Sequence, residues 1–177
     1  MKYQTALVRG LVRLHKVGRH SSSRGGANSV RRRFPAIAWN SILTALRASS
    51  CASFSPSPEQ GAGFMQRTQT QTIGGVTVTV AVPSAEEATA VFGIPLQSRR
   101  IQPVWVRVEN KDDAPYVFLA ADMDPDYFSP QEVAWMFHSG FSSPAEHDMQ
   151  VYLDKQALPL YIPPEEAREG FVHTNQD

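Results

Sequence analysis

Two stretches of the chain alternate apolar and polar side chains with a period of two, the pattern of a strand with one buried face. Every second residue of 76–82 is valine, and three valines alternate with other residues in 101–110. A cluster of turn formers, residues 110–115, separates the second stretch from another apolar run, 116–121. The pattern therefore predicts an antiparallel hairpin made by 101–110 and 116–121.

Three helices are predicted from serines followed three residues later by glutamate, the sequence of a capping box. The pairs are Ser84 with Glu87, Ser129 with Glu132, and Ser143 with Glu146. We expect the first helix to run to Phe92 and to end at Gly93, because glycine readily adopts the left-handed conformation that closes a helix. Two later apolar runs, 158–162 and 170–174, predict further strands.

These elements define the expected fold class. The five predicted strands and three short helices do not alternate regularly, which argues against a doubly wound α/β sheet. The chain is therefore predicted to be mainly β, an antiparallel β-sandwich with helical insertions.

Charge divides the chain into two parts. The whole chain has 17 basic and 17 acidic residues, but residues 1–50 contain ten Lys or Arg and no Asp or Glu. Residues 51–177 consequently have a net charge of minus ten. We expect a basic leader followed by a soluble body. The acidic body argues against a nucleic-acid partner, because such binding depends on Lys and Arg clustered against phosphates.

The end of the leader has the organisation of a signal peptide. Three arginines, 31–33, precede an apolar run of about thirteen residues, 34–46, which is shorter than the roughly twenty needed to span a bilayer. The small residues Ser49 and Ser50 come before Cys51, the only cysteine of the chain. Three alternatives stay open: an unmodified thiol near a linker, a mitochondrial presequence at the start, and a translation start later than Met1.

Composition changes again after Cys51. Residues 52–72 are rich in Ser, Pro, Gly, Gln and Thr, which predicts a flexible tether. The expected organisation is a leader and signal peptide over 1–50, a tether over 51–72, and a β-sandwich domain over 73–177.

Three acidic side chains are candidate calcium ligands. Asp122, Asp124 and Asp126 have the spacing of the first three ligands of a calcium loop. Tyr127 stands where an EF-hand needs glycine, and Val133 stands where it needs glutamate. The competing interpretation is structural, because acidic residues before the helix at Pro130 are favoured by the helix dipole.

Other candidate chemistry in the body is sparse. His138, His147 and His173 do not form a metal-ligand motif, so we expect solvated or capping histidines and no resident cofactor. Trp105 and Trp135 are predicted to pack in the core or across strands. No nucleophile motif or phosphate-binding glycine loop is present in the sequence.

Two resemblances add to this picture. Ala48-Ser49-Ser50-Cys51 resembles the lipobox of bacterial lipoproteins, which implies lipid attachment at Cys51, and Ala52 after it implies sorting to the outer membrane. Several stretches of the body resemble a group of uncharacterised bacterial lipoproteins with an immunoglobulin-like β-sandwich: GGVTVTVAVPSAEEATAVFGIPL, IQPVWVRVENKDDAPYVF, DPDYFSP and PPEEAREGFVHTN. The resemblance implies a fold and an address but no catalytic residue.

The expected protein is a lipid-anchored cell-envelope protein, at the outer membrane facing the periplasm, whose domain serves binding or assembly. The alternative is a small metal-dependent hydrolase that uses the acidic loop at Asp122–Asp126. An immunoglobulin-like sandwich has about seven strands. Because only five are predicted, we expect the sandwich to lack its last strand and residues 170–174 to lie at an open edge. Either the chain is truncated, or an envelope protein donates the missing strand.

Overall fold

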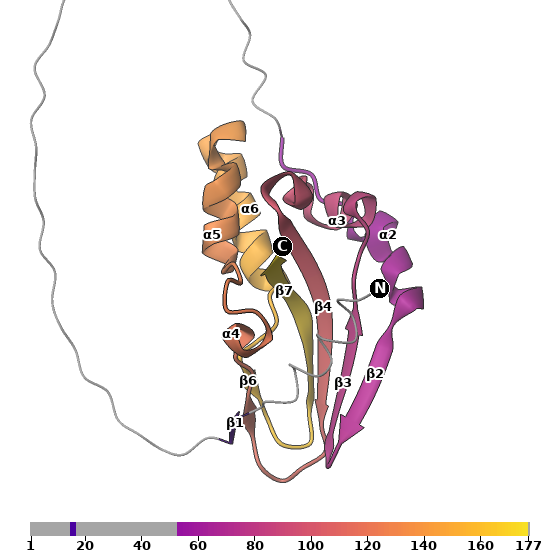
Figure 1. Cartoon of the computed structure of the whole chain (residues 1–177). Coiled ribbons are helices and arrows are strands. Elements are labelled where there is room, and N and C mark those ends of the chain that lie inside the picture. The colour runs from indigo at the N-terminus through magenta and orange to yellow at the C-terminus, as the bar shows by residue number, and fades with distance from the viewer. Residues whose placement is uncertain (1–14, 17–52, 177) are drawn as a thin grey trace, which may run out of the picture. The chain divides into compact units, whose positions relative to one another are not determined.

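The computed structural model describes residues 15–16 and 53–176 (Figure 1). The strands are β1 (His15–Lys16), β2 (Gln69–Ile73), β3 (Val76–Ala81), β4 (Ile101–Asn110), β5 (Tyr116–Val117), β6 (Tyr161–Ile162) and β7 (Ala167–Asn175). The α-helices are α2 (Pro58–Gly61), α3 (Ala85–Phe92), α4 (Ala120–Met123), α5 (Pro130–Phe137) and α6 (Ser143–Gln156). Three 3-10 helices are η1 (Ala62–Arg67), η2 (Leu96–Arg99) and η3 (His138–Gly140).

The main element is a four-stranded antiparallel sheet in the order β2-β3-β4-β7. A smaller sheet has the order β1-β5-β6. The fold is thus mainly antiparallel β with helices, as predicted at that level. The alternation of valine in 76–82 correctly located β3, whose Val78 and Val80 lie opposite Val108 and Val106 of β4.

The predicted hairpin between 101–110 and 116–121 is wrong. β4 pairs with β3 along one edge and with β7 along the other, and β5 pairs with β6 and β1 instead. Buried Asn110 redirects the chain, because its Nδ2 donates to Ala114 O at 2.9 Å and to Pro163 O at 2.8 Å. The loop after β4 is thereby tied to the turn before β7. A nine-residue β7 also offers β4 a much longer ladder than a two-residue β5.

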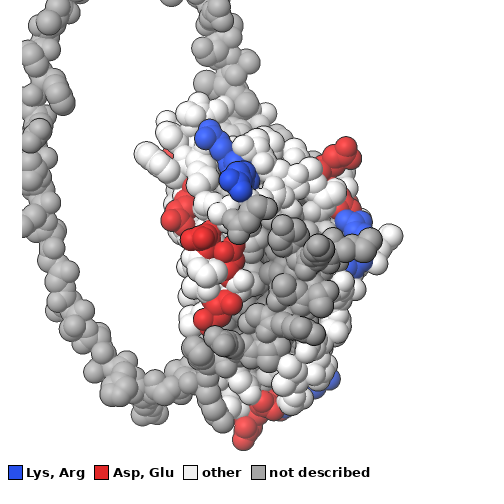
Figure 2. All heavy atoms as spheres, viewed as in Figure 1, with Lys and Arg blue, Asp and Glu red and all other residues white. Residues whose placement is uncertain are grey.

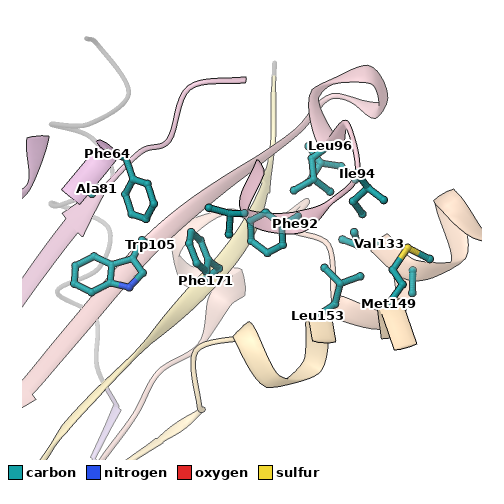
Figure 3. Close-up of a cluster of buried hydrophobic side chains, with 13 residues drawn as sticks. Phe64, Ala81, Phe92, Ile94, Leu96, Trp105, Val133, Met149, Leu153 and Phe171 are labelled. Carbon is teal, nitrogen blue, oxygen red and sulfur yellow. The ribbon is translucent and has the colours of Figure 1, made fainter. Parts of the chain in front are cut away.

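Buried side chains lie on both faces of the main sheet. On one face, Trp105 and Phe171 pack with side chains of α3, α5 and α6 (Figure 3), and the rings of Phe92 and Phe171 lie 4.9 Å apart in an edge-to-face contact. On the other face, the valines of β3 and β4 pack with Phe118, Leu158 and Ile162. The prediction that Trp105 lies in the core is confirmed.

Two of the three predicted helix starts are confirmed. Ser84 and Ser129 each accept a hydrogen bond from the backbone N–H of the glutamate three residues later, and that glutamate accepts one from the serine N–H. Gly93, with a φ of +66°, ends α3 as expected. The third start is displaced by one residue: Ser142 is the N-cap of α6, makes no side-chain capping bond, and leaves Ser143 as the first helical residue.

Residues 53–68 are a packed part of the domain rather than the predicted flexible tether. Phe64 of η1 is in the core, and Ser57 N donates to Ala90 O at 2.6 Å. Arg67 forms an ion pair with Glu87 of α3, and this hydrogen bond holds the pKa of Glu87 below its usual range. Phe64 and Gly61 are buried, so this segment packs on the domain despite its polar composition. Residues 69–72, also assigned to the tether, belong to β2, which Gly74, with a φ of +60°, connects to β3.

The predicted open edge at residues 170–174 is also wrong. β7 pairs with β4 from Ala167 to Asn175, and residues 170–174 are buried. On the opposite edge, Phe171 O and His173 O accept hydrogen bonds from Leu158 N and Phe128 N, at 3.0 Å and 2.8 Å. The chain itself therefore occupies this edge, and β2 lies at the other end of the sheet.

Candidate functional site

Cys51, the predicted lipid-attachment residue, lies outside the described residues. The described chain resumes two residues later and packs almost at once. The ring of Phe54 lies 6.2 Å from that of Phe141 and 5.6 Å from that of Tyr152, both edge-to-face. Tyr152 in turn donates a hydrogen bond to Val91 O at 2.7 Å. The third residue after Cys51 is therefore already fixed to the helical layer.

Phe141 lies in the junction between α5 and α6, and an exposed aromatic side chain, Trp135, lies near the end of α5. Trp135 is 70% exposed. The imidazole of His138 is stacked on its indole with ring centroids 4.4 Å apart and an interplanar angle of 12°, and His138 Nδ1 lies 2.5 Å from Trp135 O. The prediction that Trp135 packs in the core is wrong. On α5 the buried residues are Val133 and Ala134, so a helical projection places Trp135 away from the core.

Basic side chains lie at the same end. The guanidinium carbon of Arg99 is 6.0 Å from the ring centroid of Phe137, within the range of a cation–π contact. Arg100, which caps η2 in the left-handed conformation, donates from Nε to Gln176 O at 2.9 Å. Both arginines are exposed. We call the surface formed by Trp135, Phe137, His138, Arg99 and Arg100 the α5–α6 end.

The acidic loop has a structural role, and Asp124 makes its main hydrogen bonds. Asp124 Oδ1 accepts from Asp126 N at 2.9 Å, and Asp124 Oδ2 accepts from Asn175 N at 2.7 Å. Both oxygens of Asp124 thus bind backbone N–H groups, and one of them holds the end of β7. Asp122 belongs to α4 and does not join them in a ligand cluster. Over residues 53–176, no group of three or more His, Cys, Asp or Glu is placed to hold a metal ion.

His173 is a buried core residue. It is 1% exposed, packs its ring 5.3 Å from that of Phe92, and lies opposite Pro103 in the β4–β7 ladder. Its Nε2 has no hydrogen-bond partner. Burial among apolar groups lowers the pKa of His173 to about 4, because the charged imidazolium would be poorly solvated there. The expectation of a solvated or capping histidine is wrong at this position.

The histidines and the acidic loop are not brought together. His138 is stacked on Trp135, and His147 lies exposed in the first turns of α6. His173 is joined to the segment after the acidic loop by a backbone bridge to Phe128. The described residues thus offer no paired acid and base for the hydrolase alternative.

Two further properties bear on the class of protein. Among the described helices, none is both long and apolar enough to cross a bilayer. Comparisons with protein-family models, with curated proteins and with solved structures found no match for this chain.

Proposed function

We propose that this chain is a lipid-anchored protein of the bacterial cell envelope, held at the outer membrane through Cys51 and facing the periplasm. The observation that carries the proposal is the order of three features: Arg31–Arg33, the apolar run 34–46, and small residues ending at the single cysteine. An acidic domain that begins to pack at Phe54 fits a chain whose preceding part is removed.

The domain serves binding or assembly in this proposal. The described residues contain no group of three or more His, Cys, Asp or Glu placed to hold a metal ion, and His138 is stacked on Trp135 rather than beside the acidic loop, so the geometry supports a binding role better than the hydrolase alternative. Calcium is accordingly given no part in it, because both Asp124 oxygens are used by backbone donors.

For the fold we propose the finer class suggested by the sequence, an immunoglobulin-like β-sandwich. The support is that β5 and β6 pair beside the valine face of the main sheet, with Phe118 and Ile162 packed against it. These strands would form the second layer. Cleavage before Cys51 would remove β1 and leave β5 paired with β6 alone.

An envelope protein that pairs a strand with the domain remains part of the proposal. The edge of β7 is occupied by Leu158 and Phe128, so such a strand would add beside β2, the other end of the sheet.

The direct test is incorporation of labelled fatty acid into the full chain expressed in a bacterial host with two membranes. Label should enter the wild-type protein and should be absent from Cys51→Ala. Ser50→Ala, which keeps a small residue beside the cysteine and keeps the thiol, is the matched control and should retain label. Label that persists in Cys51→Ala would refute attachment at this residue.

A further inference from the structure

We propose that the α5–α6 end of the domain lies against the lipid bilayer, with Trp135 in the headgroup region. This inference rests on the lipid attachment at Cys51 proposed above. It adds an orientation and a membrane-contacting surface.

The first argument is the reach of the chain. Cys51 and Phe54 are three residues apart, and an extended chain spans at most about 3.3 to 3.6 Å per residue. A lipid on Cys51 would therefore hold Phe54 within roughly 11 Å of the acyl attachment point. Phe54 packs on Phe141 and Tyr152, so the α5–α6 junction is held near the membrane as well. A packed segment, unlike a flexible tether, also restricts rotation of the domain relative to the membrane.

The second argument is the chemistry of this end. Trp135 is the most exposed of the large hydrophobic side chains in residues 53–176. Indole has an apolar body and a polar N–H, which is why tryptophan concentrates at membrane–water interfaces. Because His138 is stacked on Trp135 and bound to its carbonyl, the indole is held outward rather than folded onto the domain.

Charge contributes little to this orientation. Figure 2 shows blue Lys and Arg side chains at the upper end of the domain, but red acidic side chains also lie at its upper right and blue ones at its lower right. Arg99 lies beside the ring of Phe137, and Arg100 directly precedes β4. Acidic Asp112 and Asp113 follow the far end of β4. Ten strand residues separate these ends by roughly 30 Å. Glu146 in the first turn of α6 makes the upper end mixed in charge, so Trp135 carries most of the expected attraction.

The test compares two labelling positions on the lipidated protein. Ser139→Cys, at the α5–α6 end, and Lys111→Cys, just after β4, each add one thiol at an exposed residue. Since Cys51 is the only native cysteine and its thiol carries the lipid in this proposal, a fluorophore attaches only at the new position. The protein, with fatty-acid label on Cys51 confirmed, is placed in vesicles of phosphatidylethanolamine and phosphatidylglycerol. Spin-labelled lipids then quench the fluorophore according to its depth.

We expect quenching at Ser139→Cys to exceed that at Lys111→Cys several-fold. Adding Trp135→Ala should reduce quenching at the first position, whereas Val151→Ala, which truncates another exposed apolar side chain in the helical layer, should leave it unchanged. Equal quenching at both positions with label present on Cys51 would overturn this orientation alone. A second outcome would also overturn the orientation: the thiol of Ser139→Cys is protected from soluble reagents, but its fluorophore is not quenched by the lipids. A protein, and not the bilayer, would then cover this surface. Absence of label would overturn the anchor and the orientation together.

Discussion

The ring of Phe54 meets the ring of Phe141 edge-to-face, with centroids 6.2 Å apart, and so joins the beginning of the packed chain to the α5–α6 junction. Phe54 is partly buried against the helical core. The contact explains why a segment with the composition of a linker is ordered so close to Cys51.

Phe54→Ala should destabilise the domain by about 1 to 3 kcal/mol, below the 3 to 5 typical of a fully buried phenylalanine, because the ring is only partly buried. Tyr161→Ala, at a residue that is 52% exposed, should change stability by less than about 0.5 kcal/mol. Chemical denaturation of both variants measures the difference. Equal stability of the two variants would mean that residues 53–57 do not pack on the domain in solution.

Ser129→Ala should cost about 0.5 to 2 kcal/mol, because the Ser129 hydroxyl caps α5 by accepting from Glu132 N at 3.2 Å. Ser143→Ala is the matched control. Ser143 lies inside α6 and is not its N-cap, so the free energy of unfolding should be almost unchanged. A similar loss in both variants would contradict the start of α6 at Ser143.

Sequence alone located the features that depend on neighbouring residues. The Ser84 and Ser129 caps and the valine alternation of β3 involve groups only a few positions apart, so the pattern contains the whole interaction. Which strands pair with one another in the sheet is not determined by neighbouring residues. The pairing of β4 with β7 joins residues that are far apart in the sequence, as does the hydrogen bond from Asn110 to Pro163 O, 53 residues away. No local pattern in 101–121 contains that information.

Some features of the candidate site could be predicted from the sequence, and others depend on residues that are distant in the sequence. The spacing of Asp122, Asp124 and Asp126 suggested ligands, but Asn175 N, 51 residues after Asp124, takes one of its oxygens. Exposure of Trp135 could have been predicted, because it lies opposite Val133 on a helical projection. Packing of Phe54 depends on Phe141 and Tyr152, which are distant in sequence, so composition alone assigned this segment to a tether.

Stability should fall as the pH drops from about 6.5 toward 4. The pKa of His173 is lowered by burial to about 4, from 6.5 for an ordinary histidine. Between these values the unfolded chain binds a proton that the folded chain does not, so the stabilisation is fully present above pH 6.5 and is lost below it. The loss should be on the order of 3 kcal/mol. Urea denaturation at a series of pH values measures it.

His173→Leu, which keeps an apolar side chain of similar size, should flatten this pH dependence. His147→Gln is the control and should preserve the wild-type dependence, because His147 is exposed. If the stability of wild type and His173→Leu changes in parallel with pH, another group is responsible.

Backbone amides of Gly170, Phe171, Val172, His173 and Thr174 should exchange slowly with solvent, because these residues are buried beside β4. Amides of β2, whose residues are mostly exposed, should exchange faster. Hydrogen exchange followed by mass spectrometry or NMR distinguishes the two segments. Fast exchange throughout residues 170–174 would show that β7 is an open edge after all.

The intact mass of the protein purified from envelope membranes tests the central claim most directly. We predict the mass of residues 51–177 plus covalently bound lipid, with an amino-terminal Cys51 on fragmentation. The Cys51→Ala variant should carry no lipid mass. A membrane-derived protein that retains residues 1–50, or one that begins elsewhere with an unmodified Cys51, would contradict the lipid anchor.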